Sequence, residues 1–136
     1  MITIAASVAA MRALGAQTAA SAHAGDIYVL EGELGAGKTE FVRGFVASIA
    51  PQAAVRSPSF SILNIYETSR FPVYHFDFYR LRNAAELREI GFDDYASGEG
   101  ICLVEWGTLF PEVLPQEATI IRFSDIGYGR REVALP

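Results

Sequence analysis

The feature that most constrains the fold is the segment "GELGAGKT" at residues 32–39. It follows a short apolar run, Ile27–Glu31, of the kind found in strands that are buried on both faces of a parallel sheet. It precedes a stretch with apolar residues at helical spacing, which Pro51 closes. These residues are Phe41, Val42, Phe45, Val46 and Ile49. A strand, a glycine loop and a helix in this order predict a phosphate-binding P-loop.

The residue types within this loop suit the recognition of a triphosphate. Gly32, Gly35 and Gly37 permit backbone conformations closed to other residues and let N–H groups approach phosphate oxygens. Lys38 is the only lysine of the chain, and its compact charge would reach the β- and γ-phosphates. Thr39 would begin the helix with its hydroxyl on Mg²⁺, and the positive end of the helix dipole would face the same anions. We therefore expect ATP and Mg²⁺ as ligands.

A P-loop site also needs an acid at the end of a neighbouring strand to hold magnesium. Two candidates are Glu105 after "ICLV" and Asp77 after "VYHF". Glu105 follows the more continuous apolar run and is our first choice for the metal, while Asp77 would order the attacking nucleophile. Either acid could instead be an exposed residue at a strand end. His75 is more typical of a core histidine than of a base, and Trp106 packs either near the nucleotide or in the core.

The remaining pattern predicts a single domain over residues 1–136. It is α/β, a P-loop NTPase-like three-layer sandwich with a mainly parallel sheet and antiparallel edge strands. A helix is predicted over about residues 4–22, with Ile4, Val8, Met11 and Leu14 on one face, although Gly15 weakens it. A short helix capped by Asn83 ends at Gly91, and "ATIIRF" with "REVALP" predicts a terminal hairpin. Both "SPSFSILNIYE" and "VYHFDFYR" look extended. Arg80 and Arg82 could steer phosphates or belong to a solvated face, and we expect the solvated face.

Charge and cysteine content restrict the setting. The net charge of −5 argues against a protein that holds nucleic acid by its own surface, so any contact with nucleic acid would be indirect. A single cysteine, Cys102, lies in an apolar run and fits a reducing cytoplasm. The chain contains no run of eighteen apolar residues, so we expect no membrane span. No basic residue precedes the apolar stretch of the alanine-rich start, so we do not expect a secretory signal there.

Five segments occur in order along the chain: "GELGAGKT", "SPSFSILNIY", "YHFDFYRL", "ELREIGFDDY" and "ICLVEW". Together they resemble the TsaE family, formerly called YjeE, over about residues 25–131. The resemblance implies a small bacterial ATPase that supports formation of threonylcarbamoyladenosine in tRNA. It also implies two partner proteins, TsaD and TsaB, which carry out the carbamoyl transfer, and slow hydrolysis without them.

The resemblance further implies the roles of individual residues. The catalytic residues would be Asp77, Lys38 and Glu105, and the metal ligands would be Thr39 and Glu105. The nucleotide-contacting residues would be Gly35, Ala36, Gly37, Lys38, Thr39, Glu40, Ser59, Trp106, Thr108 and Gly129. Glu40 stands where the family commonly has a second hydroxyl residue.

Other kinds of P-loop protein are constrained by the same residues. A guanine-reading N-K-x-D motif needs a second lysine, which the chain lacks, so a GTPase is disfavoured. A small-molecule kinase remains as an alternative, with "YRLRNAAELREIG" as the only room for a lid. A nucleotide-gated binding module without useful hydrolysis is a third hypothesis.

Overall fold

A seven-stranded mixed sheet organises the fold in the computed structural model, which describes residues 1–136. The strands are β1 (Ile2–Ala5), β2 (Ile27–Glu31), β3 (Leu63–Tyr66), β4 (Val73–Asp77), β5 (Ile101–Glu105), β6 (Thr119–Gly127) and β7 (Arg130–Ala134). Their order is β1-β7-β6-β2-β5-β4-β3. Neighbours from β6 to β4 run parallel, whereas β1, β7 and β3 join antiparallel at the two edges. The predicted sheet is confirmed.

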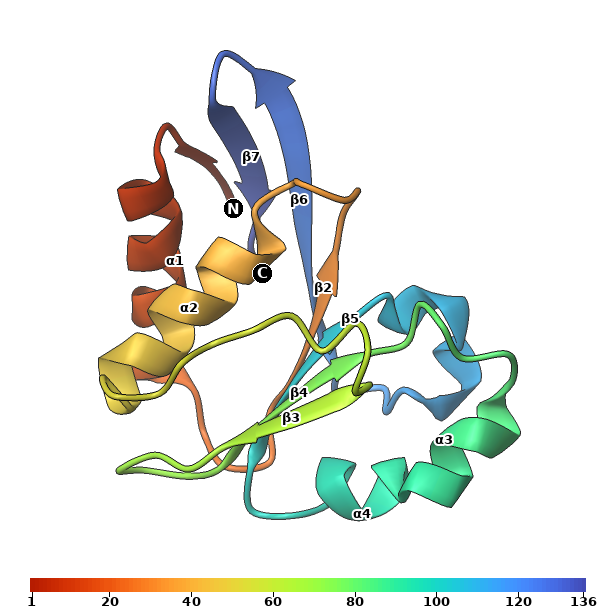
Figure 1. Ribbon diagram of the computed structural model, residues 1–136. Coiled ribbons are helices and arrows are strands. Elements are labelled where there is room, and N and C mark those ends of the chain that lie inside the picture. Colours follow the sequence, from red (N-terminus) through yellow and green to blue (C-terminus); the bar gives the residue numbers. More distant parts are fainter.

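Helices cover both faces of this sheet, which confirms the three layers (Figure 1). The long helices α1 (Val8–Ser21) and α2 (Lys38–Ile49) lie side by side on one face. The short helices α3 (Ala84–Ile90) and α4 (Phe92–Ala96) cover the other face, together with the 3-10 turns η1 (Gly107–Leu109) and η2 (Pro111–Val113). Each interface encloses its own apolar core. No helix has both the length and the apolarity needed to cross a bilayer.

Glycines allow α1 and α2 to pack in close contact. A Cβ on Gly15 would lie 2.0 Å from the carbonyl oxygen of Phe41, and one on Gly44 would lie 1.9 Å from that of Arg12. Neither position has room for a methyl group. Gly15, which the sequence suggests only as a weak point of a helix, is therefore a packing residue.

The predicted apolar face of α2 is confirmed. All five apolar residues predicted to face inward from α2 are buried. On β4, Phe76 packs into the core under α3 and α4, while His75 and Asp77 point to the face that carries α2. The register of β4 and β5 sets Asp77 opposite Glu105.

The prediction of one helix over residues 4–22 is wrong at its start. The chain first forms β1, which pairs with β7 from the far end of the sequence. The helix begins after Ser7, whose side chain accepts a hydrogen bond from the Ala10 N–H at 3.0 Å, as an N-cap does. Ile4 and Val8, predicted on the buried face, are 46% and 55% exposed. The spacing of apolar residues in a short segment gives no information about pairing with a strand at the other end of the chain.

The segment 57–61, predicted as extended, is instead a loop that leads into β3. The Ile62 N–H donates to the Pro58 carbonyl at 2.7 Å and closes a turn, and Ile62 itself has φ 70°. The left-handed region is unusual for a β-branched residue. The loop folds back here, and the Asp77 N–H donates to the Ile62 carbonyl at 2.8 Å.

The short helix and the hairpin are confirmed. The Asn83 side chain caps α3 by accepting from the Glu86 N–H at 3.1 Å, and Gly91 ends the helix with φ 85°. The β6–β7 hairpin turns through Gly127, Tyr128 and Gly129, which all have positive φ.

Candidate functional site

The connections of β2 and β5 open a crevice at the carboxyl ends of these neighbouring parallel strands. From β2 the chain enters α2 on one face of the sheet, whereas from β5 it continues through η1 and η2 on the other face. Such a reversal point is where open α/β sheets bind ligands. The glycine-rich segment and the two strand-end acids all lie at this crevice.

The loop from residue 32 to residue 37 presents backbone N–H groups to the crevice. Gly35 and Gly37 have φ values of 83° and 102°, in the left-handed region where glycine is favoured. Gly37 is also the N-cap of α2 and offers no side chain, so the first N–H groups of the helix have no capping partner. Gly32 instead allows close packing of the loop against β6, because a Cβ there would lie 2.7 Å from the Phe123 carbonyl oxygen. The helix start is therefore open to an anion.

Lys38 is a buried cation at the open start of α2. The residue is only 5% exposed, and its Nζ donates to the Gly32 carbonyl and lies 4.4 Å from the centre of the Trp106 ring. None of the ion pairs in the structure includes it. Burial lowers the pKa of Lys38 below its ordinary value, although the charges of Glu105, Asp77 and Glu33 act in the opposite direction. An ammonium group in this setting suits an anionic ligand.

A cavity of about 300 Å³ lies between the loop and the ends of β4 and β5. It brings together eight of the residues singled out from the sequence, namely Gly35, Gly37, Lys38, Thr39, Ser59, Asp77, Glu105 and Trp106. The further lining residues are Glu33, Leu34, Ser57, Tyr79 and Arg80. Segments from four parts of the chain thus converge on one cavity.

The two acids are held in the wall of this cavity. Asp77 is 7% exposed, and its Oδ1 accepts from the Tyr79 N–H at 2.9 Å while its Oδ2 accepts from the Ser59 hydroxyl at 3.4 Å. Glu105 is 5% exposed, and its Oε2 lies 2.6 Å from His75 Nε2. Neither residue is therefore an exposed strand-end acid, the alternative that the sequence left open.

Trp106 lies at the site and not in the centre of a core. It directly follows Glu105 and has φ 59°, a strained conformation for a bulky residue. Its half-buried ring lines the cavity beside Lys38 and contacts the Tyr79 ring at 5.0 Å between centres. The residue also packs against the core under α3 and α4, and its contact with a nucleotide stays a prediction.

Four residues implied by the resemblance lie elsewhere. Ala36 is 1% exposed and does not line the cavity, and its N–H donates to the Glu33 carbonyl at 3.1 Å. Glu40 and Gly129 line a second cavity of about 220 Å³ on the α1 side of the loop, which shares Gly35 and Gly37 with the first. Thr108 lines a third cavity of about 320 Å³ on another side of Trp106. Their roles stay predictions.

The carboxylate of Glu40 is occupied by two arginines. Its Oε2 accepts from Arg12 Nε at 2.7 Å, and its Oε1 accepts from Arg43. Burial, the largest single effect, raises the pKa of Glu40, but the hydrogen bonds and charges of Arg12 and Arg43 outweigh it and hold the pKa below its usual value. Glu40 therefore ties α2 to α1.

Arg80 is exposed, as the sequence predicted, and it also lines the cavity, where the sequence did not place it. Its guanidinium lies 4.5 Å over the ring of Phe60, which is 85% exposed. The available signal was its position three residues after Asp77, just beyond a strand end. Arg82 is exposed, as the sequence predicted.

The oxygen donors of the cavity fit Mg²⁺ bound together with phosphates. Thr39 and Glu105 offer a hydroxyl and a carboxylate, and hard oxygen ligands of this kind suit magnesium. No cluster of three or more His, Cys, Asp or Glu side chains forms a metal site by itself. Because magnesium usually keeps several waters and takes further ligands from phosphates, a sparse donor set is what a Mg-nucleotide site requires.

The layered sheet with a glycine loop between β2 and α2 defines a protein of the P-loop NTPase-like α/β class. The sequence profile of one family within this class, described as threonylcarbamoyl adenosine biosynthesis protein TsaE, matches residues 5–133. This chain belongs to the TsaE family. The match extends beyond the resemblance seen in the motifs, because it includes α1.

Individual relatives agree with this assignment. The tRNA threonylcarbamoyladenosine biosynthesis protein TsaE of Bacillus subtilis is 43% identical over 124 residues, which cover 91% of this chain and 77% of the relative. The protein of the same name from Treponema pallidum is 35% identical over 111 residues, which cover 82% of each. The crystal structure of Bacillus subtilis YdiB superimposes with a TM-score of 0.83 at 36% identity, over 98% of this chain and 82% of that one.

Proposed function

We propose that this protein binds ATP with Mg²⁺ and hydrolyses it, as the ATPase component of threonylcarbamoyladenosine biosynthesis in tRNA. Membership in the TsaE family and relatives named for that pathway support the pathway assignment. The single observation that carries the ATP assignment is Lys38, a buried ammonium without a carboxylate partner at the uncapped start of α2. A buried charge is tolerated when a ligand neutralises it.

The P-loop would hold the phosphates. In this proposal the N–H groups of residues 35–39 cradle the phosphate oxygens, and Lys38 bridges the β- and γ-phosphates. Thr39 and Glu105 would hold the metal, which when bound neutralises charge on the phosphate oxygens. Lys38 would exchange its bond to the Gly32 carbonyl for the phosphate oxygens.

Asp77 is our candidate for ordering the attacking water. Its two oxygens are held by the Tyr79 N–H and the Ser59 hydroxyl, so the carboxylate has a fixed direction in the cavity wall. A fixed acceptor can orient water in line with the bond to be broken. Arg80 is the second cation of the cavity and would stabilise charge on the γ-phosphate.

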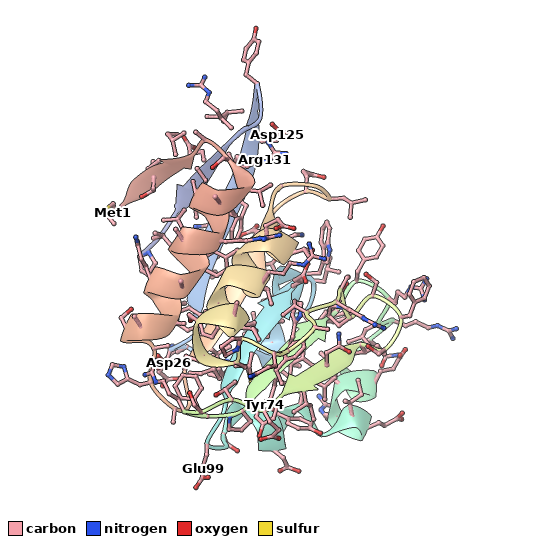
Figure 2. All side chains as sticks on the ribbon, turned by 60° about the vertical axis from the view of Figure 1, so that its left-hand side comes forward. Met1, Asp26, Tyr74, Glu99, Asp125 and Arg131 are labelled. Carbon is pink, nitrogen blue, oxygen red and sulfur yellow. The ribbon has the colours of Figure 1, made fainter.

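The cavity on the α1 side is our candidate for the nucleoside. Gly35 and Gly37 line both this cavity and the one proposed for the phosphates. Arg131 borders it, and its Nε donates to the Gly35 carbonyl at 3.3 Å. Figure 2 shows Arg131 beside Asp125 near the turn of the β6–β7 hairpin, to which an ion pair of 3.4 Å joins it. The hairpin would thus flank the nucleotide, with Gly129 at its tip.

Partner proteins would couple hydrolysis to tRNA modification. With a net charge of −5 the protein has no excess of cations to hold tRNA, so TsaD and TsaB would contact the RNA in the cytoplasm. We expect that adding both proteins raises the rate of ATP hydrolysis. An unchanged rate would count against the partnership and leave nucleotide binding intact.

Equilibrium titration with a fluorescent ATP analogue tests the proposed site. Removing a charge-assisted contact is worth about 1.5–3 kcal/mol, so Lys38→Ala should weaken binding by about 10- to 100-fold. Arg88→Ala on α3, an exposed cation far from the cavity, is the matched control and should bind as the wild type does. Equal affinity of Lys38→Ala and wild type would refute the phosphate-cradle assignment.

A further inference from the structure

One buried polar pair beneath the cavity remains unexplained by the proposed chemistry. His75 lies in the middle of β4 with no exposed surface, and its Nε2 is 2.6 Å from Glu105 Oε2. Its other ring nitrogen, Nδ1, is also buried and has no hydrogen-bond partner. Val73 and Leu103, on the same face of the sheet, are fully buried apolar residues.

One ring nitrogen of His75 has no partner inside the core. Because a carboxylate oxygen accepts, the ring donates from Nε2, while Nδ1 has no hydrogen-bond partner. Burying an unsatisfied polar atom is unfavourable, and the hydrogen bond to Glu105 is the only polar contact of the ring that offsets it. The contact with Glu105 therefore accounts for a histidine at this position.

The effect of the contact falls on Glu105. The hydrogen bond from His75 is the only one made by the Glu105 side chain, which otherwise has several rotatable bonds. It occupies Oε2 and leaves Oε1 available to the cavity that Glu105 lines. The groups that ligate metals in proteins are commonly oriented by such second contacts.

We propose that His75 is a positioning residue that holds the Glu105 carboxylate in the orientation needed to bind Mg²⁺ with one oxygen. This inference rests on the proposed function, since it needs a Mg-nucleotide at the cavity. His75 would act through Glu105 and would not touch the nucleotide. Removing the His75 side chain should lower the affinity for Mg²⁺. The affinity for nucleotide in the absence of metal should stay unchanged.

The test compares variants of the full chain by Mg²⁺ titration in the presence of ADP. Trp106 is the only tryptophan and lines the cavity, so its fluorescence reports binding directly. For His75→Leu we expect a half-saturating Mg²⁺ concentration about 10- to 100-fold higher than that of wild type. Affinity for ADP in EDTA should stay within about twofold. The melting temperature should fall, because the buried Glu105 carboxylate loses its only hydrogen-bond donor.

Two further substitutions separate positioning from simple packing. Gln carries an amide donor that can reach the place of Nε2, whereas Asn is too short, so His75→Gln should retain more of the Mg²⁺ affinity than His75→Asn. This pair also decides the matter if His75→Leu does not fold. Phe76→Leu, on the opposite face of β4, is the control that should lower the melting temperature without changing the Mg²⁺ dependence.

The outcomes distinguish this inference from the proposed function. Wild-type Mg²⁺ dependence in all His75 variants, with or without lower stability, would identify the histidine as an ordinary core residue and overturn the inference alone. Wild type that binds no ADP, with or without Mg²⁺, would overturn both. A raised Mg²⁺ requirement for His75→Leu and His75→Asn, with recovery in His75→Gln, supports positioning.

Discussion

Gly44→Ala tests whether α1 and α2 pack in backbone contact. The new Cβ would lie 1.9 Å from the Arg12 carbonyl oxygen. A carbon–oxygen contact is normally about 3.3 Å or longer, so α1 would have to move by about 1.4 Å. Both colliding atoms belong to backbone or to Cβ, and no side-chain rotation relieves the contact. Helix propensity alone predicts the opposite result, because alanine is favoured over glycine by about 1 kcal/mol inside a helix.

The magnitude follows from these two opposing effects. Overpacking of this kind typically costs about 1–3 kcal/mol, and the rigid contact places Gly44 at or above the upper end. After subtracting about 1 kcal/mol for helix propensity, we expect a net loss of about 2 kcal/mol in the free energy of unfolding. For a chain of this length 1 kcal/mol corresponds to about 3 to 4 °C, so the melting temperature should fall by about 7 °C.

Thermal unfolding followed by circular dichroism measures this change. Gln17→Ala, at an exposed position of α1, is the control and should change stability by less than about 0.5 kcal/mol. The shift should also reach the site, because the Met11 side chain of α1 lies against Gly37 of the loop. We therefore expect weaker nucleotide binding as well. A melting temperature of Gly44→Ala equal to or above that of wild type would refute the close packing.

Three more predictions concern single side chains. Arg80→Ala should reduce kcat for ATP hydrolysis by about tenfold or more with a smaller effect on nucleotide affinity, whereas Arg82→Ala should not; equal losses would exclude a specific role in the cavity. Glu40→Gln should lose about 0.5–1 kcal/mol at pH 7, because its two arginine partners are half exposed. The pKa of Glu40 is lowered, so its contribution exists above the unfolded pKa and disappears as the pH falls through the folded value. The melting temperatures of the two proteins should therefore converge as the pH falls below the ordinary range of a glutamate, and a constant difference would contradict the ion pairs. Burial raises the pKa of the Cys102 thiol to about 12, so a thiol reagent at neutral pH should react with it only when the protein unfolds. Labelling should be slower when nucleotide is present, and fast labelling of the folded protein would contradict this burial.

The sequence predicted those cavity residues that belong to one continuous segment or that directly follow an apolar run. The P-loop is one continuous segment, so its glycines, Lys38 and Thr39 are readable without a fold. Asp77 and Glu105 were found because each ends an apolar run, and parallel strands bring their carboxyl ends to the same edge of a sheet. The hydrogen bond between His75 and Glu105 was not found, because it joins residues 30 positions apart.

The features that sequence reasoning missed depend on pairing between distant segments. The strand β1 looked like the start of a helix, since its partner β7 lies at the other end of the chain. The loop 57–61 looked extended, since the turn that folds it back is closed by backbone groups and by a left-handed Ile62. The place of Arg80 at the cavity was not predicted, because the Phe60 ring that its guanidinium contacts belongs to that same loop.

Glu40 illustrates how one position can change while the site around it stays intact. A P-loop uses the residue after the first helical hydroxyl residue through its backbone N–H, and α2 begins at Lys38, so Glu40 still presents that N–H at the open end of the helix. Its side chain is then free for another task and accepts hydrogen bonds from Arg12 and Arg43. Arg12 is also the residue whose carbonyl faces Gly44, so the ion pair and the glycine contact join α1 to the same part of α2. In the proposed site, glutamate in place of a hydroxyl residue would thus add a connection between helices and keep the backbone N–H available to phosphate.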